Sequence, residues 1–224
     1  MSEHLKGEQW LASRQRRAFD IAAATSVIPA LAPVVFMGAL AFAAETRIHP
    51  LFLQQRVGRA GEPFTIAKLR TMPFVEDQAN ASTGYGDERA TRVGRFLRKY
   101  TIDEIPQWGQ VLAGQMSVVG PRPLVPSEVA ETLDLLSPSE KNDWIHARTV
   151  AKPGFLSDFG NLTRTLDADV GNWLLARVEA DCVYADTASA ETDIRIIRES
   201  LKIGAKVIQA ANTVDGVRVI PDTE

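Results

Sequence analysis

The chain has 224 residues, a hydrophobic fraction of 45% and a formal net charge of −3, which suits one folded domain with or without an anchor. This balance gives no support for a nucleic-acid-binding protein, because that class depends on an excess of positive charge. A single cysteine, Cys182, excludes an intramolecular disulfide framework, and the three histidines form no recognisable zinc or triad spacing.

An uncharged apolar segment lies near the N-terminus. Residues 1–13 are polar and predict a mobile start, whereas residues 21–44 contain no charged residue. This run exceeds the roughly 20 residues that a membrane-spanning helix needs. Pro29 and Pro33 each remove a helical hydrogen bond. A helix broken at Pro33 has two arms of about 12 residues, each reaching roughly 18 Å, which is short of an apolar core of about 30 Å.

Basic residues flank this segment on both sides, and positive charge marks the cytoplasmic side of a membrane. The pattern therefore fits a re-entrant helix over residues 14–47 that dips into one leaflet. A kinked spanning helix fits the same residues, because membrane helices tolerate proline. The hydroxyls placed to compensate for the lost backbone bonds are those of Thr25 and Ser26.

Residues 48–211 are predicted to form a cytoplasmic domain, followed by a loose tail over 212–224. Two extended runs, 51–57 and 64–69, flank a Gly- and Pro-containing turn and predict a β-hairpin. Residues 76–88 predict a mobile loop. A helix over 91–100 has one basic and one apolar face, which suits either an anionic membrane surface or a soluble helix with a solvated face.

Asp103 and Glu104 form an acidic pair surrounded by basic residues. Two carboxylates among many cations predict a site for a divalent metal and a phosphorylated substrate. Pro106 favours a helix that starts there, with both carboxylates just before its N-terminus, where the helix dipole favours anions. The alternative is a capping box from Thr101 to Glu104, which would put Pro106 at an unfavourable interior position.

Arg122 stands between Pro121 and Pro123, which restrict its backbone. A guanidinium presented in this way can grip a phosphate with two parallel hydrogen bonds; the alternative is a surface arginine in a Pro-rich turn. Gly114 predicts the end of a short helix. Residues 155–170 look irregular, and helices are predicted over 137–149, 171–185 and 190–210. The last helix has an apolar stripe that predicts core packing rather than a membrane face, made of Ile194, Ile197, Leu201, Ala205 and Ile208.

Taken in order, several blocks between residues 15 and 210 resemble the bacterial sugar transferase family, the monotopic polyprenyl-phosphate phosphoglycosyl transferases. The chain resembles the short form, without the large N-terminal membrane region of some relatives. The blocks are Arg17-Ala18-Phe19-Asp20, Pro33, Gln55-Arg56-Val57-Gly58, Phe64-Thr65-Ile66-Ala67-Lys68-Leu69-Arg70-Thr71-Met72, Thr91-Arg92-Val93-Gly94-Arg95-Phe96-Leu97-Arg98, Asp103-Glu104-Ile105-Pro106-Gln107 and Met116-Ser117-Val118-Val119-Gly120-Pro121-Arg122-Pro123.

The resemblance implies an α+β, mostly helical fold: a membrane re-entrant helix hairpin, a small β-hairpin and surface-associated amphipathic helices. It implies an enzyme at the cytoplasmic face of the bacterial inner membrane. This enzyme would move sugar 1-phosphate from a nucleotide sugar, commonly a UDP-sugar, to undecaprenyl phosphate and release UMP. The product would start the assembly of exopolysaccharide, capsule, O-antigen or another glycan.

By the same resemblance, Asp103 would be the nucleophile that carries a covalent phosphosugar. Glu104 would support it, and both carboxylates would lie at a Mg²⁺ site. Arg122 is the best candidate for a substrate phosphate contact. Weaker candidates, which could instead bind membrane lipids or support the fold, are Arg56, Lys68, Arg70 and Arg95.

Two departures from the family pattern stand out. Ala32 replaces the serine that usually precedes the breaking proline, and residues 155–164 keep only Arg164 of the usual motif. The second departure concerns the sugar and nucleotide contacts, and it leaves open a catalytically inactive membrane-bound scaffold that binds polyprenyl phosphate or partner proteins. A third class, a single-span protein with a soluble binding domain, does not explain the acidic and basic blocks. The sequence names neither the sugar nor the glycan pathway, and it leaves open a homo-oligomer.

Overall fold

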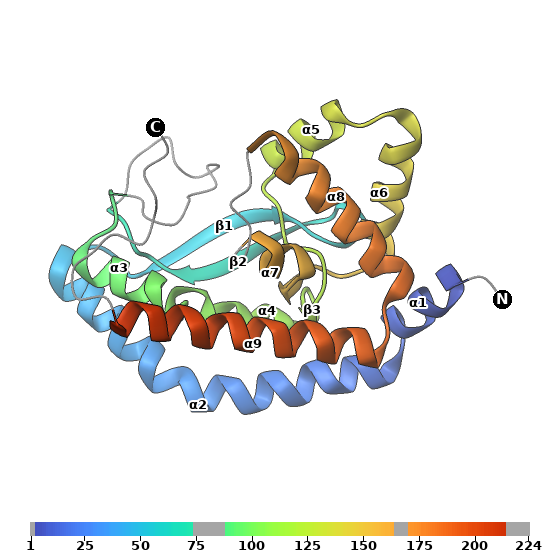
Figure 1. Cartoon of the computed structure of the whole chain (residues 1–224). Coiled ribbons are helices and arrows are strands. Elements are labelled where there is room, and N and C mark those ends of the chain that lie inside the picture. The colour runs from blue at the N-terminus through green and yellow to red at the C-terminus, as the bar shows by residue number, and fades with distance from the viewer. Residues whose placement is uncertain (1–2, 74–87, 164–169, 214–224) are drawn as a thin grey trace.

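The computed structural model of the chain describes residues 3–73, 88–163 and 170–213. Helices predominate, and the described strands form two sheets of two strands each (Figure 1). The predicted mostly helical α+β class is therefore confirmed. Most of the predicted loop over 76–88 and of the predicted tail over 212–224 lies outside the described residues.

The N-terminal residues form a packed helix rather than the predicted mobile start. Helix α1 (Glu3–Leu11) lies against α8 (Val170–Thr187), and a side chain at Gly7 would overlap the backbone of Ala185. The indole Nε1 of Trp10 donates to Asp193 Oδ2 at 2.9 Å. These partners lie more than 170 residues away in the chain, so the local sequence could not indicate them.

Helix α2 (Arg14–Thr46) is one continuous helix, with Pro29 and Pro33 inside it. Figure 1 shows that α2 bends, but the helix does not end at either proline, so the predicted break at Pro33 and the re-entrant hairpin are not confirmed. The hydroxyls of Thr25 and Ser26 donate to the carbonyls of Ile21 and Ala22, each at 2.8 Å. The sequence predicted that these hydroxyls would compensate for the backbone hydrogen bonds lost at the prolines. They bond other carbonyls instead, so this prediction is wrong.

Both ends of α2 contact the same domain. Near its start, Asp20 accepts hydrogen bonds from the Ser117 hydroxyl and the Val118 amide, each at 2.9 Å. Near its end, Glu45 accepts hydrogen bonds from the amides of Arg92 and Val93, each at 3.0 Å. The domain thus holds α2 at two points that are 25 residues apart along the helix.

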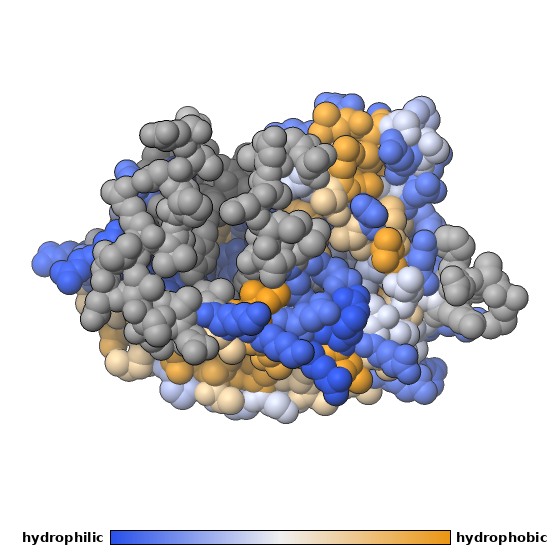
Figure 2. All heavy atoms as spheres, viewed as in Figure 1, coloured by the Kyte–Doolittle hydropathy of each residue, from blue (hydrophilic) through white to orange (hydrophobic). Residues whose placement is uncertain are grey.

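The outer face of α2 is apolar and exposed. The helix is long and apolar enough to cross a membrane, and Figure 2 shows apolar side chains along the lower edge, where α2 lies. Phe36 is 67% exposed. The other large apolar side chains exposed on this helix are Phe19, Ile21, Val34, Met37 and Leu40. Apolar surface of this extent is expected of a membrane contact, so the chain is membrane-associated.

The predicted β-hairpin is confirmed. Strand β1 (Leu51–Val57) pairs antiparallel with β2 (Pro63–Leu69), and a short 3₁₀ turn, η1 (Arg59–Gly61), connects them. Alternation along the strands buries Gln54 and Arg56 on the same face as Ile66 and Phe64. Strand β2 also contacts η3 (Ile102–Gln107), the segment that contains the acidic pair.

Helix α3 (Arg92–Lys99) is confirmed, with Thr91 as its N-cap: the Thr91 hydroxyl accepts from the Gly94 amide at 2.9 Å. Helix α4 (Trp108–Ala113) ends at Gly114, as predicted, and Gly114 adopts the left-handed conformation with φ of 85°. The remaining elements are β3 (Ser117–Val119), α5 (Pro126–Leu135), α6 (Pro138–Val150), β4 (Gly154–Leu156), α7 (Asp158–Thr163), α8 and α9 (Ala190–Thr213). Strand β4 and helix α7 replace the irregular structure predicted for residues 155–163.

The buried face of α9 differs from the predicted stripe. Ile196 is fully buried, whereas Leu201 is 68% exposed and Ile194 is also exposed, so the stripe is wrong at both positions. Asp193 and Ser200 are buried instead. They are satisfied there because Asp193 accepts from the Tyr184 hydroxyl at 2.8 Å, and Ser200 donates to Asn161 at 2.7 Å. Apolar periodicity missed this face because polar residues occupy part of it.

Candidate active site

The acidic pair lies in η3, a 3₁₀ helix of six residues. Thr101 precedes it with φ of 56°, and its side chain makes no capping hydrogen bond, so the alternative of a capping box is wrong. The predicted start at Pro106 is wrong: the helix begins at Ile102, so Asp103 and Glu104 occupy its first turn. The left-handed conformation of Thr101 redirects the chain before Pro106, and such a conformation is not evident from residue spacing.

Lys68 joins the hairpin to the acidic pair. Its Nζ donates to Glu104 Oε1 at 2.7 Å, and the two side chains are only 17% and 20% exposed. The pKa of Asp103 is raised to about 6, mainly by burial and also by the neighbouring Glu104 carboxylate, whereas Lys68 and Arg98 oppose this rise. Asp103 is therefore ionised at neutral pH while remaining in partly desolvated surroundings, a combination that favours a reactive carboxylate.

Arg56 lies buried beneath the turn that presents Arg122. Its Nη1 donates to the carbonyl of Pro123 at 3.2 Å, and its Nη2 donates to Gln54 Oε1 at 2.6 Å. The pKa of Arg56 is lowered to about 10, mainly by burial and also by Arg122, while Glu128 and Glu104 oppose the decrease. The Arg122 side chain is exposed. Arg56 thus holds the turn, and Arg122 is free to meet a ligand from solvent.

Two of the predicted phosphate-binding residues, Arg70 and Arg95, donate hydrogen bonds to backbone carbonyls. Arg70 Nε donates to the carbonyl of His49 at 3.1 Å, and its guanidinium lies 5.6 Å from the centre of the Phe52 ring. Arg95 Nη1 donates to the carbonyl of Ala90 at 2.7 Å. The described contacts join Arg56, Lys68 and Arg122 to the surroundings of the acidic pair, but they provide no such link for Arg70 and Arg95.

Residues 11–206 match the family model described as bacterial sugar transferase. The chain belongs to the bacterial sugar transferase family. It is 38% identical over 189 residues to the UDP-glucose:undecaprenyl-phosphate glucose-1-phosphate transferase of Caulobacter vibrioides, covering 82% of this chain and 67% of that protein.

Two further relatives are longer proteins. The UDP-N-acetylgalactosamine-undecaprenyl-phosphate N-acetylgalactosaminephosphotransferase of Aeromonas hydrophila is 32% identical over 188 residues, covering 84% of this chain and 43% of that protein. The undecaprenyl-phosphate glucose phosphotransferase of Komagataeibacter xylinus is 34% identical over 190 residues, covering 84% of this chain and 35% of that protein. The chain therefore spans less than half of the length of these two relatives.

The stretch that departs from the usual sugar transferase motif is packed into the domain. Phe155 lies against Trp108, with 5.0 Å between ring centres, and Phe159 stacks on Trp173 with 6.2 Å between ring centres. Strand β4 pairs in parallel with β3, and side chains at Gly120 or Gly154 would overlap the other residue's backbone or that of Lys152. These two glycines therefore let β4 support the turn that carries Arg122.

The acidic pair of this sugar transferase has the chemistry of a Mg²⁺ site. The described residues hold no group of three or more metal-ligating His, Cys, Asp or Glu side chains. However, Mg²⁺ is commonly held by one or two carboxylates, with water and substrate phosphates completing its shell. Glu104 raises the pKa of Asp103, and a cation held by these residues would relieve this repulsion. Asp103 and Glu104 therefore fit the ion.

Three arginines near the site escaped the sequence prediction. Arg98 opposes the rise in the Asp103 pKa; its place among the basic residues of α3 was the available signal. Arg148 Nη2 donates to the carbonyl of Arg122 at 3.1 Å, and its Nη1 donates to Asp181 at 2.8 Å. Arg177 interacts electrostatically with Arg122. Neither Arg148 nor Arg177 lies in a sequence pattern that distinguishes it from a solvated helix residue.

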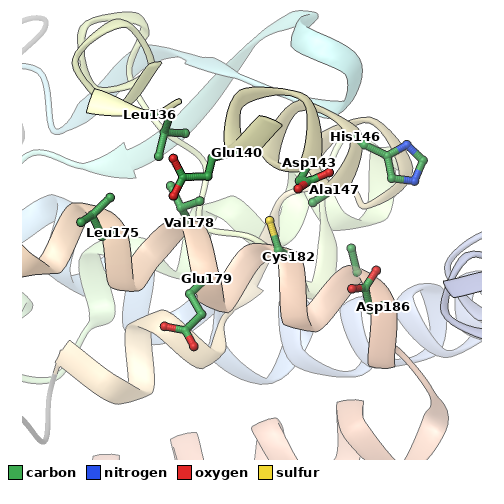
Figure 3. Close-up of a pocket in the computed structure, with 11 residues that line it drawn as sticks. Leu136, Glu140, Asp143, His146, Ala147, Leu175, Val178, Glu179, Cys182 and Asp186 are labelled. Carbon is green, nitrogen blue, oxygen red and sulfur yellow. The ribbon is translucent and has the colours of Figure 1, made fainter. Parts of the chain in front are cut away.

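A pocket of about 600 Å³ lies between α6 and α8 (Figure 3). None of the predicted site residues lines it, and Glu140, Asp143, Glu179 and Asp186 give it an acidic character, which disfavours phosphate. The pKa of the Cys182 thiol in this pocket is raised to about 11, mainly by burial and also by nearby carboxylates. The raised pKa disfavours a nucleophilic thiolate at Cys182.

Proposed function

We propose that the chain transfers sugar 1-phosphate from a UDP-sugar to undecaprenyl phosphate and releases UMP, thereby starting the assembly of an exopolysaccharide or related glycan. The observation that carries this proposal is Asp103, a carboxyl group with a raised pKa beside the ion pair of Glu104 and Lys68. Family membership and the names of the relatives support the two substrates.

Asp103 acts as the nucleophile in this proposal. Its carboxylate oxygen attacks the sugar-bearing phosphorus of the donor, and the bond from that phosphorus to the oxygen of the UMP group breaks, so UMP leaves with the electron pair. A phosphate oxygen of undecaprenyl phosphate then attacks the same phosphorus and expels the Asp103 carboxylate. Two displacements replace one, and two bulky anionic substrates use one site in turn.

Basic residues offset the negative charge that these steps bring together. Lys68 holds Glu104 in place and opposes the rise in the pKa of Asp103, which keeps the nucleophile ionised. The exposed Arg122 guanidinium binds the donor diphosphate through charge-assisted hydrogen bonds. When bound at Asp103 and Glu104, Mg²⁺ would neutralise charge on the phosphoryl oxygens.

We further propose that α2 enters one leaflet of the bacterial inner membrane and returns to the cytoplasmic face. The contacts at Asp20 and Glu45 support this topology, because a helix crossing the bilayer could not keep both ends on one domain. The packing of η3 against α2 would then bring Asp103 close to the lipid headgroups, where the phosphate of undecaprenyl phosphate lies.

The altered stretch over 155–164 favours a second candidate, a scaffold that binds polyprenyl phosphate or partner proteins without turnover. A panel of UDP-sugars, supplied with undecaprenyl phosphate and Mg²⁺, distinguishes the two functions. We expect at least one donor to give UMP release that depends on undecaprenyl phosphate. No release from any donor would contradict the enzyme and favour the scaffold.

A further inference from the structure

Arg177 on α8 is buried, and two of its three guanidinium nitrogens have no hydrogen-bond partner among the described residues. The residue is 1% exposed, and its Nε and Nη1 atoms are buried without a hydrogen-bond partner among the described residues. The Nε atom of Arg56 is likewise buried without a hydrogen-bond partner among the described residues. A buried donor left without a partner destabilises the folded state, and more so when it is charged. A fold that keeps such groups close to a candidate substrate site needs an explanation beyond packing.

Positive charge exceeds negative charge around this residue. Burial lowers the pKa of Arg177; Glu128 and Asp181 oppose the decrease, and Arg148 and Arg122 add to it. Both carboxylates already have an arginine partner, since Arg148 lies 2.8 Å from Asp181 and Arg56 lies 3.6 Å from Glu128. We call Arg56, Arg122, Arg148 and Arg177 the arginine cluster. Its four positive charges face three carboxylates, Glu104, Glu128 and Asp181, and Glu104 is already paired with Lys68.

Two aromatic rings lie against the Arg177 guanidinium. Its Cζ atom lies 4.3 Å from the centre of the Trp173 ring and 5.3 Å from the centre of the Phe159 ring. Cation–π contacts of this kind stabilise a guanidinium without neutralising its charge. The charge of Arg177 therefore remains available to act on a neighbouring anion.

We propose that the arginine cluster is an anion subsite for a substrate phosphate group, and that Arg177 is a positioning residue that acts through Arg122. Arg122 is the exposed member of this cluster and would touch the phosphate, whereas Arg56, Arg148 and Arg177 lie behind it. A bound phosphate relieves the repulsion among the four guanidiniums, so each buried charge strengthens binding at Arg122 without direct contact. This inference rests on the proposed function only for the identity of the ligand.

The test compares phosphate binding by the full chain and by Arg177→Met, in detergent, with UMP, pyrophosphate and undecaprenyl phosphate added separately. Met fills a similar volume without charge, and replacing a buried charge by an apolar group is often neutral or stabilising. We expect a melting temperature without ligand that is unchanged or higher, together with a Kd raised about tenfold, which corresponds to about 1.4 kcal/mol.

Two variants control this experiment. Arg177→Lys keeps the positive charge and should restore most of the affinity, which a purely structural role would not predict. Arg198→Met makes the same chemical change at an exposed position on α9 and should leave every Kd unchanged. A weaker affinity for UMP and pyrophosphate assigns the subsite to the donor, and a weaker affinity for the lipid alone assigns it to the acceptor.

Equal affinity of the wild-type chain and Arg177→Met for all three ligands would overturn the inference, as would an equal loss in Arg177→Lys. A wild-type chain that binds none of the three would overturn it as well. These outcomes differ from failure of the proposed function, which is absence of UMP release by the wild-type chain. A chain that binds phosphate through Arg177 without turning over would retain this subsite and lose the proposed reaction.

Discussion

Lys68 on strand β2 and Glu104 on η3 form an ion pair of 2.7 Å between Nζ and Oε1, 36 residues apart in sequence. This pair fixes the hairpin against the segment that carries Asp103. Because Lys68 also opposes the rise in the Asp103 pKa, the same side chain sets both the position and the ionisation of the proposed nucleophile.

Replacement of Lys68 by Met should therefore impair turnover and alter its pH dependence. We expect kcat to fall by at least about tenfold, and the acidic limb of the kcat/KM profile to move to higher pH, because Asp103 loses a cation that favours its ionised form. Lys202→Met, at an exposed position on α9, is the matched control. An acidic limb that does not move would show that Lys68 does not act on Asp103.

Asp103→Asn should stabilise the chain above pH 6. The folded-state pKa of about 6 exceeds the ordinary value of 3.8, so ionisation of Asp103 opposes folding by roughly 2–3 kcal/mol at neutral pH. We expect Asp103→Asn to have the higher melting temperature at pH 8. The difference should shrink between about pH 6 and pH 4, where the folded state binds the proton first, and disappear below that range.

Thermal unfolding of both proteins from pH 4 to pH 8 measures this difference. A constant difference across the range would mean that the pKa of Asp103 is the same in the folded and unfolded states. Turnover should report on the same carboxyl group, because only ionised Asp103 can act as the nucleophile. We expect kcat/KM of the wild-type chain to fall about tenfold for each pH unit below 6.

Two glycine substitutions should change stability in opposite directions. Gly154→Ala places a Cβ against the Gly120 backbone, and overpacking of this kind costs roughly 1–3 kcal/mol. Gly204→Ala meets nothing within 4 Å on α9, and alanine favours a helix by up to about 1 kcal/mol. Denaturant unfolding should therefore weaken the first variant and strengthen the second. Equal effects would contradict the close contact of β3 and β4.

Both ends of α2 should be reachable from the cytoplasm. In a Cys182→Ala background, Gln15→Cys and His49→Cys place single thiols at exposed positions near the two ends of α2. A membrane-impermeant maleimide should label both thiols in inside-out vesicles and neither in intact spheroplasts. Labelling of His49→Cys in spheroplasts but not in inside-out vesicles would demonstrate a spanning helix and rule out the re-entrant topology.

Local patterns predicted the local elements. The alternation and turn around Gly58 gave the hairpin, Thr91 capped α3, and Gly114 ended α4, because each of these depends on residues close in sequence. The packed N-terminal helix and the polar buried face of α9 depend on Trp10, Asp193 and Tyr184 meeting from distant segments. No periodicity within one segment carries that information.

In the candidate site, too, the features that depend on nearby residues were predictable and those that depend on distant segments were not. Asp103, Glu104 and Arg122 were evident from charge contrast and from flanking prolines, whereas the start of η3 depended on the left-handed Thr101. The arginine cluster was not evident, because Arg148 and Arg177 become neighbours of Arg122 only when α6 and α8 pack behind its turn. A charged residue is recognised as buried from the residues that pack around it, and the sequence alone does not show which residues these are.

The most direct test of the central claim is to trap the phosphosugar on Asp103. The chain is incubated with the active UDP-sugar and Mg²⁺ but without undecaprenyl phosphate, quenched, digested and analysed by mass spectrometry. We predict a sugar-phosphate adduct on Asp103, formed together with an equal amount of UMP, and no adduct or turnover in Asp103→Asn. UMP release without an adduct, or turnover by Asp103→Asn, would contradict Asp103 as the nucleophile.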